Sequence, residues 1–165
     1  VVAPEALSRF YLDDTHRRVG ASWMTREDRL HEIADYVGYL DALHAGVVAG
    51  IRAETGDADV RVHVLGFSQG SETAARWAVF GDVAPYRLIL WGGRLPADLD
   101  LAAHREVLRR MRLTLVHGDA DEYATPERIV EAEAALNRHT IPYQAVTFEG
   151  GHRLSTDVLR ELAAG

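Results

Sequence analysis

Hydrophobic and polar residues along this chain follow two different periods, and the clearest change between them falls within residues 60–79. Residues 60–65 read Val-Arg-Val-His-Val-Leu, so apolar side chains alternate with Arg61 and His63, as in a β-strand. From Gln69 onward the apolar residues recur at helical spacing instead. They are Ala74, Ala75, Trp77, Ala78 and Val79. The pattern predicts a strand that turns directly into a helix.

The same two periods predict the other elements. An apolar stripe predicts a long helix that ends at Gly56, and Thr25 with Asp28 resembles the capping box that would start it. Residues 5–24 are rich in Asp, Arg and Gly, and we expect them to be irregular. Further strands are expected at 87–93, 112–116 and 142–148, and helices near 102–110, 127–137 and 156–162. In the helix at 127–137, we expect buried side chains at Ile129, Val130, Ala132 and Leu136.

Strands that alternate with helices predict an α/β fold, with a doubly wound, mostly parallel sheet and helices on both faces. The length of 165 residues suits one domain over 1–165. In such sheets the binding crevice lies beyond the carboxyl ends of the strands. Chemically active residues that follow strand ends are therefore expected to meet at one edge.

Between the strand and the helix, the segment Gly66-Phe67-Ser68-Gln69-Gly70 fits the pattern G-x-S-x-G. A turn through a single residue strains its backbone and lifts its side chain above the sheet, which suits a serine nucleophile. We expect glycine at both flanking positions because strand and helix nearly touch there. The alternative is an ordinary turn in which Ser68 caps the helix.

Two further candidates also follow predicted strands. Asp121 ends the segment 117–121, His-Gly-Asp-Ala-Asp, and His152 follows Gly-Gly after the last strand. Asp119 and Glu122 are the alternatives for the acid, and His152 has the alternative of a solvent-exposed loop residue. The order serine, acid, histidine is the order found in α/β-hydrolases.

The segments 66–70, 117–121 and 150–152 resemble the phospholipase/carboxylesterase family of α/β-hydrolase-fold serine esterases, which are related to acyl-protein thioesterases. The resemblance extends over essentially the whole chain, and it implies Ser68 as nucleophile, Asp121 as acid and His152 as base. Ser71 stands where the family usually has a second glycine. The family's first strands and oxyanion loop would lie before residue 1, so we expect an N-terminally incomplete α/β-hydrolase domain and an N-terminal segment as partner.

The expected function is a serine carboxylesterase that hydrolyses small-molecule esters, with short acyl chains, through an acyl-enzyme. The backbone N–H of Gln69 would bind the oxyanion. Trp23 and Trp91 are expected to line the substrate pocket, with core packing as the alternative for Trp91. Two other functions remain open: an acyl thioesterase that uses the same triad, and a non-catalytic fragment of this fold.

Composition narrows the remaining classes of function. A net charge of -7 argues against nucleic acid or an anionic membrane surface as partner, and no apolar run is long enough to span a membrane. The absence of cysteine and lysine excludes thiol and Schiff-base chemistry. The histidines show no metal-binding spacing, so we expect neither a metal nor another cofactor. With no signal peptide visible, a cytoplasmic location is expected.

Overall fold

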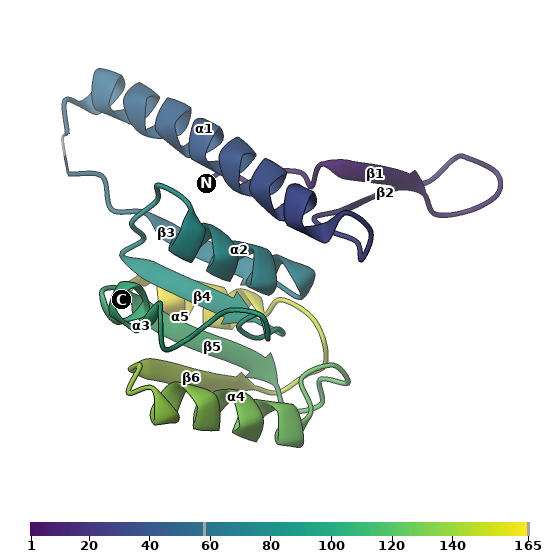
Figure 1. Cartoon of the computed structure of the whole chain (residues 1–165), viewed down its shortest axis with the longest axis vertical. Helices are drawn as coiled ribbons and strands as arrows, with labels where there is room; N and C mark the ends of the chain where they lie inside the picture. The colour runs from purple at the N-terminus through teal and green to yellow at the C-terminus, as the bar shows by residue number, and fades with distance from the viewer. Residues whose placement is uncertain (58, 165) are drawn as a thin grey trace. The chain divides into compact units, whose positions relative to one another are not determined.

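The computed structural model describes residues 1–57 and 59–164, and the chain divides into two compact units. One unit comprises Val1–Val60 and Phe80–Val83, and is called the N-terminal unit here. The other comprises Arg61–Val79 and Ala84–Gly165, and is called the C-terminal unit. Figure 1 shows the elements of both units along the chain.

A β-hairpin opens the N-terminal unit. Strand β1 (Ser8–Tyr11) pairs antiparallel with β2 (Val19–Ser22), and the backbone N–H of Leu12 donates to Arg18 O at 2.9 Å to close the loop between them. The prediction of an irregular segment over 5–24 is therefore wrong. The strands are short, and the polar loop that separates them dominates the local composition.

Helix α1 (Arg29–Thr55) follows the hairpin and ends as predicted, with Gly56 in the left-handed region at φ 71°. Its start differs from the expected capping box. Asp28 is the N-cap residue at φ 51° and makes no side-chain cap bond; its carboxylate contacts His31 Nδ1 at 2.6 Å instead. The hydroxyl of Thr25 donates to Glu32 Oε2 at 3.0 Å. The carboxylate that bonds Thr25 is therefore that of Glu32, one helical turn beyond the expected Asp28.

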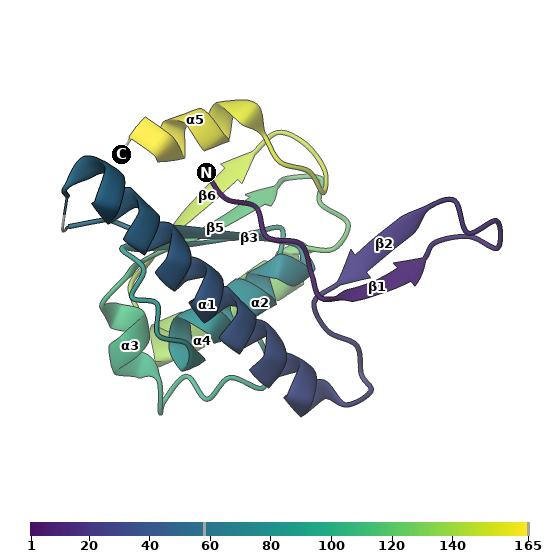
Figure 2. The same cartoon turned by 90° about the horizontal axis from the view of Figure 1, so that it is seen from above.

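The C-terminal unit is built on a parallel sheet, which confirms the predicted α/β class. Over the described residues its strand order is β3-β4-β5-β6, and every neighbouring pair is parallel. Figure 2 shows helix α5 on one face of this sheet and helices α2, α3 and α4 on the other. The strands are β3 (His63–Phe67), β4 (Arg87–Trp91), β5 (Arg112–Gly118) and β6 (Tyr143–Phe148), and the helices are α2 (Gln69–Phe80), α3 (Arg105–Arg109), α4 (Pro126–Arg138) and α5 (Thr156–Ala164).

The core of this unit lies against its central strands. All residues of β4 are buried, and Trp91 packs in one cluster with Ile89, Val116 and Val158. On α4, Leu136 is buried as predicted, whereas Val130 is 64% exposed. The expectation for Val130 is wrong because residues 129, 132 and 136 share one face of a helix, and residue 130 falls on another.

Candidate active site

Ser68 is the one residue between strand β3, which ends at Phe67, and helix α2, which begins at Gln69. Its backbone lies in the left-handed region at φ 54°, where a residue with a side chain is strained. Two hydrogen bonds hold it there: its N–H donates to Trp91 O at 2.8 Å, and its carbonyl accepts from Ser71 N–H at 3.0 Å. The strained single-residue turn expected from the sequence is present.

The two glycines of the motif have different roles. A Cβ on Gly66 would lie 2.1 Å from Gly70 O and 2.7 Å from Ser71 Cα, so only glycine fits there. A Cβ on Gly70 would have no other atom within 4 Å. The expectation that both positions require glycine is therefore wrong for Gly70, because its backbone makes the close approach while its own Cβ position is open.

Ser71 occupies the position where the family that the sequence resembles usually has glycine, and its side chain is fully buried. Its hydroxyl donates to Gly66 O at 2.9 Å and lies 3.3 Å from Trp91 O. The side chain thereby joins the ends of β3 and β4 directly beneath the turn. Gly93 makes room for it, since a Cβ on Gly93 would lie 2.5 Å from Ser71 Oγ.

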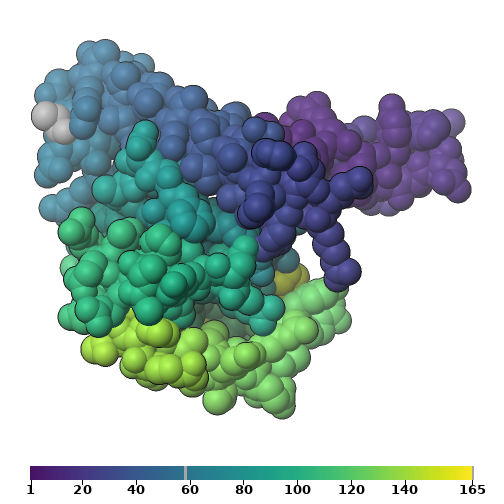
Figure 3. Space-filling view, in the orientation of Figure 1, coloured from purple at the N-terminus to yellow at the C-terminus, as the bar shows by residue number. Residues whose placement is uncertain are grey.

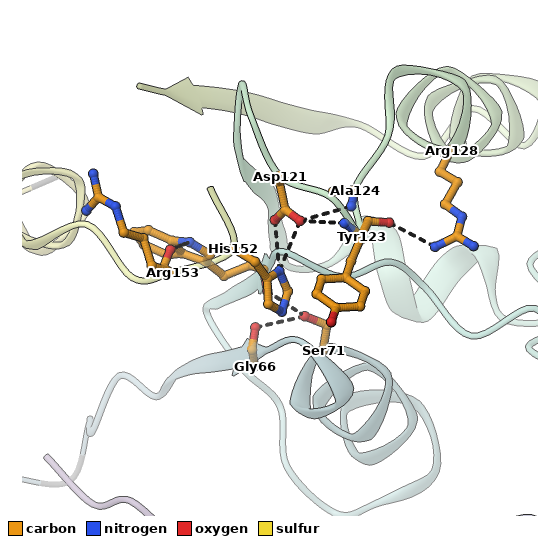
Figure 4. A network of polar contacts seen from close by, with 9 residues as sticks. Gly66, Ser71, Asp121, Tyr123, Ala124, Arg128, His152 and Arg153 are labelled. Atoms are coloured by element: carbon orange, nitrogen blue, oxygen red, sulfur yellow. Dashed lines mark hydrogen bonds and ion pairs between the residues drawn. The ribbon is translucent and has the colours of Figure 1, made fainter. Parts of the chain in front are cut away.

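Asp121 and His152 form a hydrogen-bonded pair beyond strands β5 and β6 (Figure 4). Nδ1 of His152 lies 2.9 Å from Asp121 Oδ2 and 3.1 Å from Oδ1. The carboxylates of the two alternative acids are placed differently. Asp119 Oδ1 accepts from the backbone N–H of Gly150 at 2.9 Å, and Glu122 is exposed. Of the three acids, Asp121 is the one that holds the imidazole.

The carboxyl group of Asp121 is built to stay ionised. Burial of its side chain, which is 2% exposed, opposes ionisation and is the largest single effect. The hydrogen bond to His152 and bonds from the backbone N–H groups of Tyr123 (2.9 Å) and Ala124 (3.1 Å) outweigh it and lower the pKa of Asp121. A buried carboxylate fixed in this way can orient an imidazole and stabilise its protonated form.

The loops that carry this pair are bonded to each other. The N–H of Asp119 donates to Phe148 O at 2.9 Å, and the N–H of Ala120 donates to Gly150 O at 3.0 Å. A Cβ on Gly118 would lie 2.1 Å from Gly150 O, so the two backbones are in direct contact. Asp121 and His152 thus sit on two loops that are packed as one.

The imidazole of His152 also has two aromatic neighbours, which sequence reasoning missed. Its ring centroid lies 4.8 Å from that of Phe67 and 4.7 Å from that of Tyr123. Gly92 gives the ring space, since a Cβ there would lie 2.9 Å from His152 Cε1. Phe67 immediately precedes Ser68, so the packing brings the histidine beside the strained serine turn.

A cavity of about 220 Å³ opens at this edge of the sheet, and Ser68 and Gln69 line it. His117 also lines it and contacts Thr147 Oγ1 through Nε2 at 3.0 Å. Trp91 does not line it: its side chain is buried in the core, and its Nε1–H donates to Arg153 O at 2.9 Å. Core packing is thus the alternative that applies to Trp91.

Trp23, the other expected pocket residue, belongs to the N-terminal unit. There its ring centroid lies 6.2 Å from Tyr36 and 6.5 Å from Tyr39. Its contribution to a substrate pocket stays a prediction.

Neither a metal-binding cluster nor a membrane-spanning helix is found among the described residues. They contain no group of three or more His, Asp and Glu side chains placed to hold a metal ion. No described helix is long and apolar enough to cross a membrane.

Comparison with known proteins identifies the fold. No family model matches the sequence, and no curated protein matches it. Solved structures do match. Acyl-protein thioesterase 2 of Zea mays superposes with a TM-score of 0.61 at 20% identity, over 88% of this chain and 71% of that one. SOBER1 of Arabidopsis thaliana superposes with a TM-score of 0.64 at 16% identity, over 89% of this chain and 73% of that one. A carboxylesterase of Mesorhizobium loti superposes with a TM-score of 0.60 at 21% identity, over 88% of this chain and 69% of that one. The chain has the α/β-hydrolase fold.

Proposed function

We propose that this protein is a serine hydrolase that cleaves carboxylic esters through an acyl-enzyme intermediate. The observation that carries the proposal is the strained Ser68 beside the hydrogen-bonded pair of Asp121 and His152, at one edge of a parallel sheet. Similar structures named as a carboxylesterase and a thioesterase support the same reaction class.

In the first half of the reaction, Ser68 Oγ attacks the ester carbonyl carbon while His152 takes the hydroxyl proton. The tetrahedral intermediate collapses as the bond to the alcohol oxygen breaks, and His152 returns the proton to the departing alkoxide. In the second half, water attacks the acyl-enzyme with His152 again as base. Ser68 is released with its proton, and the acid leaves.

The negative oxygen of each tetrahedral intermediate needs hydrogen-bond donors. We propose the backbone N–H of Gln69 as one, because Gln69 follows the nucleophile at the positive end of helix α2. Loss of a single donor of this kind lowers turnover by about 100- to 1,000-fold.

A thioesterase is the second candidate, because one similar structure is named as an acyl-protein thioesterase. The two functions are separated by comparing an oxygen ester and a thioester of the same acyl group. A carboxylesterase should show the higher kcat/KM for the oxygen ester, and a thioesterase the reverse.

The proposal is tested by reaction with a fluorophosphonate, which labels activated serines. We expect one adduct by intact mass on the wild-type chain and on Ser155→Ala, whose serine lies outside the cavity, and none on Ser68→Ala. Circular dichroism would establish that each variant is folded. An unlabelled, folded wild-type chain, or labelling that persists in Ser68→Ala, would contradict the proposal.

A further inference from the structure

Two arginines stand at the cavity beside Ser68. Arg94 lies in the loop after β4, and Arg128 lies on α4. Both line the cavity that contains Ser68, and both also line a second cavity of about 230 Å³. The two cavities therefore adjoin at these side chains. Figure 3 shows residues of helix α4 at the surface of the C-terminal unit, and both arginines are exposed.

Neither arginine has an acidic partner among the described residues. Arg128 donates through Nη1 to the backbone oxygen of Tyr123 at 2.9 Å, a neutral acceptor, as Figure 4 shows. Arg94 makes no hydrogen bond or ion pair in the described part of the chain. Each guanidinium retains donors that can reach a ligand.

The acidic residues at the cavities do not cancel this charge. Glu72 lines the first cavity, but its carboxylate is bonded to the buried Arg76 at 3.2 Å. Glu131 lines only the second cavity. The wall next to Ser68 thus carries two cations and one carboxylate that already has a partner.

This local charge opposes that of the whole chain, which is -7. Interactions between exposed charges are largely screened beyond about 8–10 Å at physiological salt, so distant carboxylates do not remove the field of Arg94 and Arg128. Guanidinium groups match the planar geometry of a carboxylate and bind it through paired hydrogen bonds. Apolar side chains of Leu115, Ile129 and Ala132 line the same cavity and suit a short hydrocarbon chain.

We infer that the substrates of Ser68 are esters that carry a separate, negatively charged carboxylate, which Arg94 and Arg128 bind. This inference rests on the proposed esterase function and names the class of substrate. The carboxylate belongs either to the acyl group, as in a half-ester of a dicarboxylic acid, or to the alcohol.

Matched ester pairs test the inference. For the acyl side the pair is mono-para-nitrophenyl glutarate and para-nitrophenyl pentanoate; for the alcohol side it is para-acetoxybenzoate and its methyl ester. In at least one pair, we expect kcat/KM to be about tenfold higher for the anionic ester, the effect of one good charge-assisted contact. The ratio should fall towards one in the double variant Arg94→Gln/Arg128→Gln.

The matched control is Arg138→Gln, an exposed arginine at the end of α4 that lines neither cavity. This variant should leave kcat/KM unchanged for the anionic and the neutral ester of each pair. A kcat/KM ratio of one or less in both pairs would overturn the inference, and so would a preference for the anionic ester that persists in the double variant. In either case, hydrolysis of the neutral esters would still support the proposed esterase function.

A second measurement does not depend on catalysis. Phenylglyoxal modifies accessible arginines, and peptide mass spectrometry reports the extent at each one. Glutarate, with ionic strength matched by sodium chloride, should protect Arg94 and Arg128 and leave Arg138 unprotected; neutral pentanamide should protect none of them. Equal modification with and without glutarate would overturn the inference. If glutarate protects Arg94 and Arg128 but the protein hydrolyses no ester, the anion site is supported and the proposed esterase function is contradicted.

Discussion

Ser68 and Ser71 lie three residues apart, yet their surroundings prepare them for opposite roles. Ser68 is strained and lines a cavity, whereas the hydroxyl of Ser71 is buried and donates to a backbone carbonyl. A hydroxyl whose proton is already bonded to a carbonyl, and which no solvent reaches, is not available as a nucleophile. The difference arises from backbone conformation and packing, since the two side chains are chemically identical.

Asp121 is expected to act through the orientation of His152. Asp121→Asn keeps the size of the side chain but removes the charge, and an amide can hold the imidazole in the wrong tautomer; kcat should fall by about 10⁴-fold. Steady-state hydrolysis of an activated ester measures the effect. Glu122→Gln, at the exposed neighbouring position, is the control and should retain wild-type kcat. Equal losses in the two variants would contradict the assignment of the acid.

His117 should make stability depend on pH. Burial lowers the pKa of this imidazole, against the opposing charges of Glu133 and Asp121. The folded protein therefore binds fewer protons than the unfolded chain just below pH 6.5, the ordinary histidine value. The stability supplied by the neutral ring is present above that pH, and it is lost as pH falls through the folded-state pKa.

Urea unfolding at pH 7.5 and at pH 5 measures this loss. His117→Gln should show a smaller decrease in the free energy of unfolding between the two pH values than the wild type. His63→Gln, at an exposed position of β3, is the control and should decrease as the wild type does. An identical decrease in His117→Gln would exclude a contribution from this ring.

At the scale of elements, the junction of β3 and α2 yields a prediction from its two glycines. Gly66→Ala introduces a methyl group 2.1 Å from Gly70 O and should destabilise the fold by about 1–3 kcal/mol or more. Gly70→Ala enters open space within a helix and should stabilise it by about 0.5–1 kcal/mol. Chemical denaturation of both variants checks the contrast, and similar losses in the two would refute it.

Elements and site residues differ in how far the sequence predicts them. The parallel strands and their helices are predictable within a few residues, because buried strands and amphipathic helices leave strong periods. The hairpin of β1 and β2 is not, since strands this short contain too few residues to establish a period. Ser68, Asp121 and His152 follow from motifs at strand ends. Phe67 and Tyr123 beside the imidazole do not, because only tertiary packing brings them there.

At the scale of the whole molecule, the sheet should be the slowest part of the C-terminal unit to exchange its amide hydrogens. Strand β4 is entirely buried and has a strand on each side, whereas β3 and β6 lie at the edges of the described sheet. Hydrogen–deuterium exchange followed by mass spectrometry should therefore show the greatest protection in peptides from β4 and β5. Faster exchange in β4 than in β6 would contradict this order of stability.

The candidate site belongs to a single unit. Ser68, Asp121, His152 and the residues that line both cavities all come from the C-terminal unit, although they are far apart in sequence. The rule that parallel strands bring their carboxyl ends to one edge is sufficient to predict this gathering. The rule does not place Trp23, which belongs to the N-terminal unit and follows none of the parallel strands.

The contact between the loops after β5 and β6 has a consequence for how this protein can change over time. Gly118 leaves no space beneath Gly150, and hydrogen bonds from Asp119 and Ala120 tie one loop to the other. An insertion in either loop would break bonds that the other needs. The two segments should therefore change together in evolution, with constant length in both or compensating changes in both.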